Sequence, residues 1–227
     1  MIWLWAIACK NYSANDVAQE FLQSTTTVEV THTDDWIQFT AVESTVPIGF
    51  VFYPGALVEA EAYAPVLHYI AELGIDSYAL HVPLGFAVFD RDGALPIIES
   101  EPSKSWIVGG HSLGGVAAAE MVTLDERVRG LSLWASYPDD DTDLQEYELI
   151  VHSLLGSLDN IVNREVWEQS KDLLPEVTTW IDIEGGNHSQ FGAYGLQEED
   201  GVATIPANQQ WQQTANSVAQ IAMQIID

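Results

Sequence analysis

The five residues 110–114, Gly-His-Ser-Leu-Gly, decide the fold of this chain. Residues 106–109 (Trp-Ile-Val-Gly) before them are typical of a buried strand, and residues 115–121 (Gly-Val-Ala-Ala-Ala-Glu-Met) after them are typical of a helix. A G-x-S-x-G pattern between a strand and a helix predicts a sharp turn that exposes the serine hydroxyl above the sheet. Ser112 is therefore the first candidate for a nucleophile.

The elements on either side of this turn repeat the same alternation. Apolar strands followed by amphipathic helices predict an α/β fold, in which a mostly parallel, twisted sheet is covered by helices on both faces. The expected strands are 28–30, 36–39, 48–53, 77–82, 106–109, 131–135, 149–155 and 178–183. The expected helices are 16–24, 62–73, 113–124, 164–174 and 209–226. Reacting residues in such sheets follow the carboxyl ends of the strands.

Length and composition are consistent with one domain over residues 1–227. Hydrophobic residues make up 47% of the 227 and charged residues 18%, as expected for a globular chain rather than a disordered one. We expect a helix and leading strands in residues 1–45 and a catalytic core in residues 46–227. No Cys/His cluster suggests a metal site.

The charge balance is strongly acidic, with 34 Asp and Glu against 7 Lys and Arg and a net charge of −27. Such a surface excludes nucleic-acid binding and repels anionic ligands and anionic membranes. Adaptation to high salt and an ordinary acidic surface explain this balance equally well.

The first residues of the chain are apolar only from Met1 to Cys9. This run is too short to span a bilayer and lacks the basic start of a secretory signal, so we expect a soluble protein. It would be cytoplasmic, or in the cell envelope if an anchor has been lost, because residues 6–9 (Ala-Ile-Ala-Cys) weakly match a lipoprotein cleavage site. Oligomeric state is not predicted.

A serine nucleophile requires a base, and only two histidines follow Ser112. His152 lies inside an apolar run and is expected in a strand of the core. His188 follows the strand that ends at residue 183, in a loop where Gly185 and Gly186 free the backbone to orient the ring. His188 is therefore the predicted base.

The base in turn requires a carboxylate. Asp159 has the expected place, because it follows strand 149–155, which is one strand before the strand that leads to His188. The rival acids lie in the loop after strand 131–135 and in strand 178–183; they are Asp139, Asp140, Asp141, Asp143 and Asp182. A solvated loop explains the first four best, because the alternation that resembles a calcium loop lacks its glycine and its final glutamate. Asp182 would lie within a strand.

The tetrahedral oxyanion of acyl transfer requires two backbone N–H donors. Leu113, directly after the nucleophile, supplies the first at the amino end of a helix. The loop 53–57 (Tyr-Pro-Gly-Ala-Leu) supplies the second, and Ala56 is the expected residue. A simple Pro-Gly turn is compatible with this role.

These residues resemble the dienelactone-hydrolase-like branch of the α/β-hydrolases. The resemblance covers residue 48 to the C-terminus and rests on segments 52–55, 62–65, 109–115, 134–138 and 185–192. It implies an α/β-hydrolase fold, Ser112 as nucleophile, Asp159 as acid and His188 as base. Dienelactone hydrolases themselves have a cysteine at the position of Ser112, so the resemblance does not extend to dienelactone as substrate.

The combined interpretation is a serine hydrolase that cleaves carboxylic esters without a metal or other cofactor. Residues 138–148 leave no room for a cap domain, which favours small or short-acyl neutral esters. Candidate pocket residues, for which ordinary packing is an equal interpretation, are Tyr53, Leu57, Phe86, Tyr137 and Phe191. A thioesterase or amidase would use the same triad, and a non-catalytic hydrolase-fold binding protein is the alternative from another class.

Overall fold

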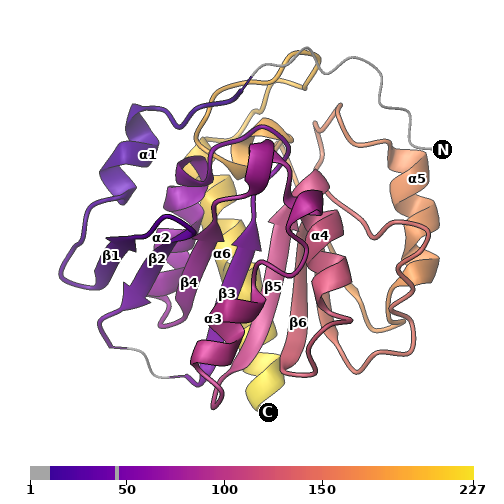
Figure 1. Ribbon diagram of the computed structural model, residues 1–227. Coiled ribbons are helices and arrows are strands. Elements are labelled where there is room, and N and C mark those ends of the chain that lie inside the picture. The colour runs from indigo at the N-terminus through magenta and orange to yellow at the C-terminus, as the bar shows by residue number, and fades with distance from the viewer. Residues whose placement is uncertain (1–10, 44–45) are drawn as a thin grey trace.

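The computed structural model describes residues 11–43 and 46–227, which include one eight-stranded sheet (Figure 1). Its strands are β1 (Val28–His32), β2 (Trp36–Ala41), β3 (Ile48–Tyr53), β4 (Asp76–Leu80), β5 (Ser105–His111), β6 (Val128–Trp134), β7 (Ile150–Gly156) and β8 (Thr179–Ile183). They are ordered β1-β2-β4-β3-β5-β6-β7-β8. β2 is antiparallel to both β1 and β4, and every other pair of neighbours is parallel. The carboxyl ends of the parallel strands therefore share one edge.

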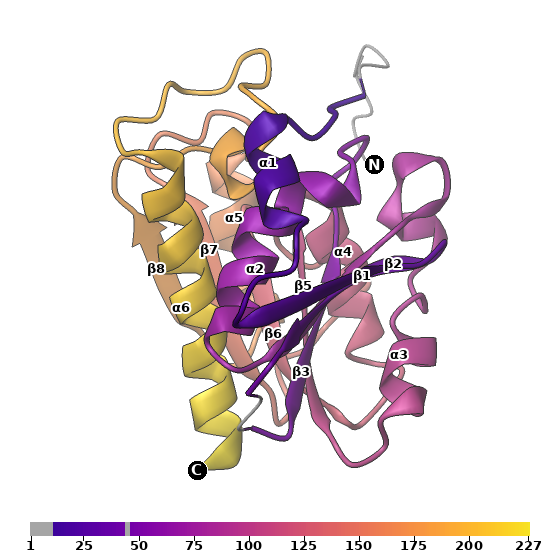
Figure 2. The same cartoon turned by 90° about the vertical axis from the view of Figure 1, so that its left-hand side faces the viewer.

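Helices cover both faces of the sheet (Figure 2). The α-helices are α1 (Asp16–Phe21), α2 (Ala64–Glu72), α3 (Leu95–Ser100), α4 (Leu113–Met121), α5 (Arg164–Gln169) and α6 (Ala207–Ile226). Short 3₁₀ turns are η1 (Ala60–Tyr63), η2 (Pro83–Gly85), η3 (Ala87–Phe89), η4 (Ser170–Leu173) and η5 (Ser189–Phe191). α1, α2 and α6 lie on one face, while α3 and α4 lie on the other. This is the α/β-hydrolase fold that the alternating pattern predicts, and no cap domain interrupts it between β6 and β7.

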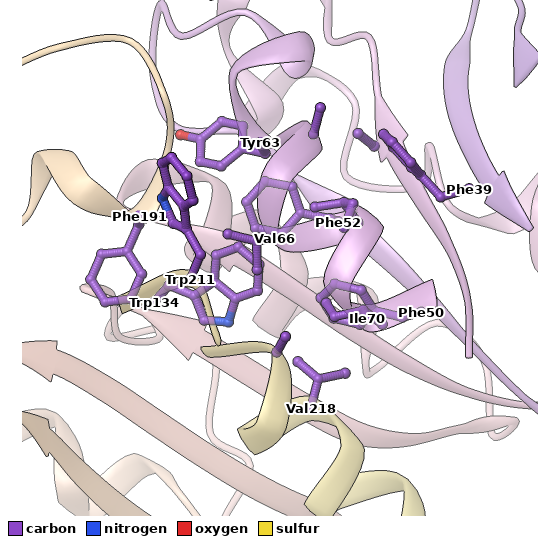
Figure 3. Packing of buried hydrophobic residues seen from close by; sticks show 14 of the residues in the cluster. Phe39, Phe50, Phe52, Tyr63, Val66, Ile70, Trp134, Phe191, Trp211 and Val218 are labelled. Atoms are coloured by element: carbon purple, nitrogen blue, oxygen red, sulfur yellow. The ribbon is translucent and has the colours of Figure 1, made fainter. Parts of the chain in front are cut away.

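The core explains why β3 is apolar throughout. All six of its residues are buried, because helices cover both of its faces. On the α2 and α6 face, Phe50 and Phe52 lie beside the ring of Trp134 at centroid distances of 6.0 and 4.4 Å (Figure 3). Ile107 of the central strand β5 and Ile183 of the edge strand β8 pack in the same cluster. This aromatic layer fixes the strands whose ends carry the candidate site.

Several element boundaries differ from the predictions. The expected helix 62–73 divides into η1 and α2, since Pro65 at the start of α2 provides no N–H. α1 ends at Phe21, three residues before its expected end. Residues 83–104, for which no element was predicted, contain η2, η3 and α3.

The apolar run from Met1 to Cys9 lies outside the described residues. Within the described part, none of the helices has the length and apolarity needed to cross a membrane.

Candidate active site

Ser112 lies at the junction of β5 and α4, in a strained backbone conformation. Its φ is 52° and its ψ is −125°, a region that costs an L-residue about 1–3 kcal/mol. Hydrogen bonds hold the turn from the neighbouring strand: the Ser112 N–H donates to the Trp134 carbonyl (3.0 Å), and the Ser136 hydroxyl donates to the Ser112 carbonyl (2.6 Å). The side chain of Ser112 remains partly exposed. This is the geometry of a nucleophile elbow.

Glycines permit the sharp turn at this junction. A Cβ atom on Gly110 would lie 2.3 Å from the carbonyl carbon of Gly114, closer than any real contact. A Cβ atom on Gly114 would lie 2.2 Å from the carbonyl oxygen of Tyr53. The two glycines of the G-x-S-x-G pattern are therefore required because three backbone segments meet there.

His188 and Asp159 form a buried pair. His188 Nδ1 lies 2.9 Å from Asp159 Oδ2, and the two residues are only 1% and 4% exposed. The other carboxylate oxygen of Asp159 accepts hydrogen bonds from the N–H groups of Ile161 (2.8 Å) and Val162 (2.9 Å). Burial raises the pKa of Asp159, but the bonds from His188, Val162 and Ile161 outweigh burial and hold that pKa below its usual value. The carboxylate is therefore ionised and able to orient the imidazole.

The loops that carry this pair are joined to each other. The Leu158 N–H donates to the Gly186 carbonyl (2.9 Å), and the Gly185 N–H donates to the Ser157 hydroxyl (2.8 Å). The backbones approach so closely that a Cβ atom on Gly156 would lie 2.6 Å from the carbonyl carbon of Gly186. These contacts between the two loops hold Asp159 and His188 in a fixed position relative to each other.

His111 links the serine side of the site to the histidine side. Its ring centroid lies 4.4 Å from that of His188, and its Nδ1 lies 2.8 Å from the Tyr63 hydroxyl. The Tyr63 oxygen accepts the Gly55 N–H (3.0 Å), so its single proton is free to be donated to His111 Nδ1. Burial, and secondarily the proximity of His188, lowers the pKa of His111 well below its usual value. His111 is accordingly neutral.

The predicted oxyanion donors are the N–H groups of Ala56, next to the residue that Tyr63 binds, and of Leu113, next to Ser112. Ala56 directly follows Gly55, and Leu113 is the first residue of α4. Among the described residues, no backbone acceptor binds the N–H of Ala56 or of Leu113. Leu57, the next residue, has a φ of 58° and donates its N–H to the Gly85 carbonyl (2.7 Å). Two N–H groups therefore remain available, one in the turn at Ser112 and one in the loop that packs against this turn.

The rival residues have other surroundings. His152 lies in β7, is buried, and contacts the Ser217 hydroxyl through Nδ1 (2.8 Å). Asp139 accepts a hydrogen bond from Thr142, and Asp182 is exposed in β8. Within residues 11–43 and 46–227, no group of three or more His, Cys, Asp or Glu side chains is placed to hold a metal ion.

The predicted pocket residues divide into two groups. Tyr53 and Phe191 have no exposed surface. The Tyr53 hydroxyl donates to the Arg91 carbonyl (2.7 Å), and Phe191 packs beside His111, so both belong to the core beneath the site. Leu57, Phe86 and Tyr137 are partly exposed and remain candidates for the substrate wall.

Four residues that surround the site were not predicted to take part: Tyr63, His111, Asp200 and Gln210. Tyr63 and His111 stand in segments that carry the family resemblance, but nothing in their spacing indicates that they meet. Asp200 and Gln210 contact the histidine loop from a later loop and from α6. Only the folded chain brings these residues together, so no local pattern could have identified them.

Comparisons with known proteins identify the family and the fold. A model described as "Alpha/beta hydrolase family" matches residues 49–212. A search of curated proteins finds no match. Similar solved structures include a dienelactone hydrolase from Anabaena variabilis (13% identity, 87% of this chain and 98% of that chain, TM-score 0.67). A predicted CIB-like hydrolase from Thermoplasma acidophilum has 12% identity, with 85% and 97% of the two chains covered and a TM-score of 0.64.

A thermophilic esterase from Thermogutta terrifontis is also similar, with 16% identity, 88% of this chain and 93% of that chain covered, and a TM-score of 0.58. At these identities the likeness concerns the fold alone. The family model, in contrast, matches residues 49–212, which are well over half of the chain. The chain therefore belongs to the alpha/beta hydrolase family.

Proposed function

We propose that this protein is a serine hydrolase that cleaves carboxylic esters through Ser112, His188 and Asp159. The observation that carries the proposal is the buried His188–Asp159 pair, at 2.9 Å, at the same edge of the sheet as a strained and partly exposed serine. A serine hydroxyl is a weak nucleophile unless an oriented base takes its proton. This arrangement supplies the base and its orienting carboxylate.

In the proposed reaction, Ser112 Oγ attacks the acyl carbon while His188 takes its proton. Asp159 holds the proton on His188 Nδ1, which leaves Nε2 free to act as the base. The N–H groups of Leu113 and Ala56 stabilise the negative oxygen of the tetrahedral intermediate. His188 then protonates the leaving alcohol, and a water molecule that His188 activates releases the acid from the acyl-enzyme.

We propose small or short-acyl neutral esters as substrates. Only residues 135–149 separate β6 from β7, so no cap domain encloses a long chain over the site. The net charge of −27 disfavours anionic esters. Leu57, Phe86 and Tyr137 offer a partly exposed apolar wall. The names of the similar structures, which include an esterase and a dienelactone hydrolase, also favour ester chemistry.

Hydrolysis of p-nitrophenyl esters from acetyl to palmitoyl tests this proposal, with Ser112→Ala and His188→Ala measured beside the wild type. We expect turnover that is fastest for short acyl groups and that both variants abolish. Turnover that persists in Ser112→Ala would contradict the serine mechanism. A wild type that cleaves thioesters or amides but no ester would correct the substrate class.

Labelling with a fluorophosphonate separates an enzyme from a binding protein on the same fold. This probe reacts with a serine only where a base activates it. We expect the wild type to be labelled and Ser112→Ala to remain unlabelled. A wild type that is neither labelled nor active would favour the non-catalytic alternative.

A further inference from the structure

We infer that Asp200 and Gln210 are positioning residues that hold the backbone on both sides of His188. The inference rests on the proposed function, because it concerns the residue proposed as base. Gln210 contacts the residue before His188, and Asp200 contacts the residue after it. Neither side chain reaches the histidine ring by a hydrogen bond in the described part of the chain, so any effect on catalysis acts through the peptide backbone.

Gln210 binds both polar groups of Asn187. Its Nε2 donates to the Asn187 carbonyl (2.8 Å), and its Oε1 accepts the Asn187 N–H (3.2 Å). Gln210 lies in the first turn of α6 and is fully buried. The two bonds hold the peptide groups on both sides of Asn187, and the second of these groups is the one that links Asn187 to His188.

Asp200 holds the opposite side of the histidine. Its Oδ2 accepts both the N–H (2.8 Å) and the hydroxyl (2.6 Å) of Ser189. Its Oδ1 accepts the N–H of Gly201 (2.8 Å) and the N–H of Asn160 (3.3 Å). Asn160 directly follows Asp159, so one buried carboxylate contacts the residue after the base and the residue after the acid. Four hydrogen bonds to one side chain thus tie the two loops together.

The loop that carries His188 requires such support because it has no regular ladder of hydrogen bonds. Residues 184–188 lie between β8 and η5, and Gly185 has a φ of 76°. A proton acceptor displaced by about 1 Å can cost about 10²-fold in rate. The Asp159 contact fixes one atom of the ring, whereas Gln210 and Asp200 fix the chain from which the ring extends.

The test compares these two residues with matched buried residues away from the histidine. Gln210→Met and Asp200→Ala remove the contacts, while Gln210→Met keeps the side-chain volume. Ser217→Ala removes a buried hydrogen bond to His152 from the same helix. Asp76→Ala removes a buried carboxylate that accepts the Ala41 N–H (3.0 Å) at the opposite end of the strands. For all four, kcat, KM and the melting temperature are measured with a short-chain p-nitrophenyl ester.

We expect kcat to fall about 10- to 100-fold in Gln210→Met and Asp200→Ala, with KM changed less than about 3-fold. The two control variants should lose stability while their kcat remains within about 2-fold of wild type. Unchanged kcat in the first pair, or an equal loss in controls of equal melting temperature, would overturn the inference.

Milder variants cover the case in which Asp200→Ala does not fold. Asp200→Asn retains an oxygen for Ser189, and Ser189→Ala removes one of the four hydrogen bonds, so both should show a smaller loss of kcat. If Asp200→Asn folds and both it and Ser189→Ala have the kcat of the wild type, the positioning role would be refuted. If the wild type itself turns over no ester and Ser112 takes no label, the proposed function fails, and the inference fails with it.

Discussion

The two halves of the candidate site are built by different means. The half that carries Asp159 and His188 is buried and held by many hydrogen bonds, from Ile161 and Val162 to the acid and between the two loops. The half that carries Ser112 and Ala56 has few such bonds, is partly exposed, and depends on positive φ angles and close backbone approaches. His111 and Tyr63 join the halves.

This difference follows from what each half would do in the proposed reaction. A base must keep its ring in one orientation, and the hydrogen bonds to Asp159 and between the two loops serve that need. An oxyanion site must offer N–H groups that have no partner before the substrate arrives, and hydrogen bonds cannot be used to hold them. The backbone must then be fixed by steric fit and by bonds to the neighbouring groups, as Trp134 and Ser136 bind Ser112 and Tyr63 binds Gly55.

The largest effect is expected from Asp159→Asn, which breaks the hydrogen-bonded half. The new amide would donate to His188 Nδ1 and so place the histidine proton on Nε2, the atom that must accept the proton of Ser112. We expect kcat to fall about 10⁴-fold with little change in KM. Ester kinetics check this, with Asp182→Asn on the exposed face of β8 as control. A loss below 10-fold would exclude Asp159 as the acid.

The next largest effect is expected from Gly114→Ala, which breaks the strained half. The added Cβ would lie 2.2 Å from the Tyr53 oxygen and 2.4 Å from the Pro54 oxygen, and backbone atoms cannot move aside easily. We expect a loss of about 3 kcal/mol in the free energy of unfolding, measured with urea. Gly195→Ala is the control, because nothing lies near that Cβ position and only its φ of 96° opposes the change. Equal losses in the two variants would show that the close approach is unimportant.

Tyr63→Phe sharpens the comparison by removing the connection between the halves. It leaves the Gly55 N–H and His111 Nδ1 buried without their partner, which costs about 1–3 kcal/mol of stability. We expect kcat to fall about 10-fold as well, because Gly55 precedes the proposed donor Ala56. Tyr194→Phe, which loses a hydrogen bond from Gln197, should keep its activity. If both variants keep full activity, Tyr63 does not connect the halves functionally.

A smaller effect concerns a histidine outside the site. Burial lowers the pKa of His68, and the nearby Glu72 only partly offsets this effect. Neither ring nitrogen has a hydrogen bond to any of the residues that the structure describes. The unfolded chain therefore binds more protons, and His68 costs stability as the pH falls below about 6.5. In His68→Leu we expect the unfolding free energy to decline less from pH 7 to pH 5 than in wild type. Parallel declines in urea titrations would refute this.

The smallest effect is expected from salt. A net charge of −27 destabilises the compact state through self-repulsion, and ions screen that repulsion. The melting temperature should rise by a few degrees from low salt to molar KCl. An unchanged melting temperature would favour an ordinary acidic protein over one adapted to high salt.

Patterns within short segments account for what could be predicted from the sequence. The fold class follows from apolar strands such as 48–53, and Ser112 and His188 follow from glycine-containing turns after strands. α3 was not predicted, because it has only six residues and Pro96 occupies its first turn, so no helical period is visible.

Contacts between distant segments account for what could not be predicted. Asp200 bonds to Ser189 and Asn160, and Gln210 bonds to Asn187, across 11, 40 and 23 residues respectively. For Tyr53 and Phe191, a place in the pocket and ordinary packing are equal predictions from the sequence. Aromatic side chains at such positions serve equally well beneath the site, and burial decides between the two only after folding.

The position of Gln210 on α6 has a consequence for biosynthesis. A nascent chain that has left the ribosome as far as Pro206 already contains Ser112, Asp159 and His188. It still lacks α6, the helix that binds Asn187 through Gln210 and packs against β6 and β7. Translation adds residues one by one, and folding of a domain follows their emergence. On the proposed mechanism, polysome-bound chains that already contain Ser112, Asp159 and His188 would therefore reach full activity only after α6 has docked.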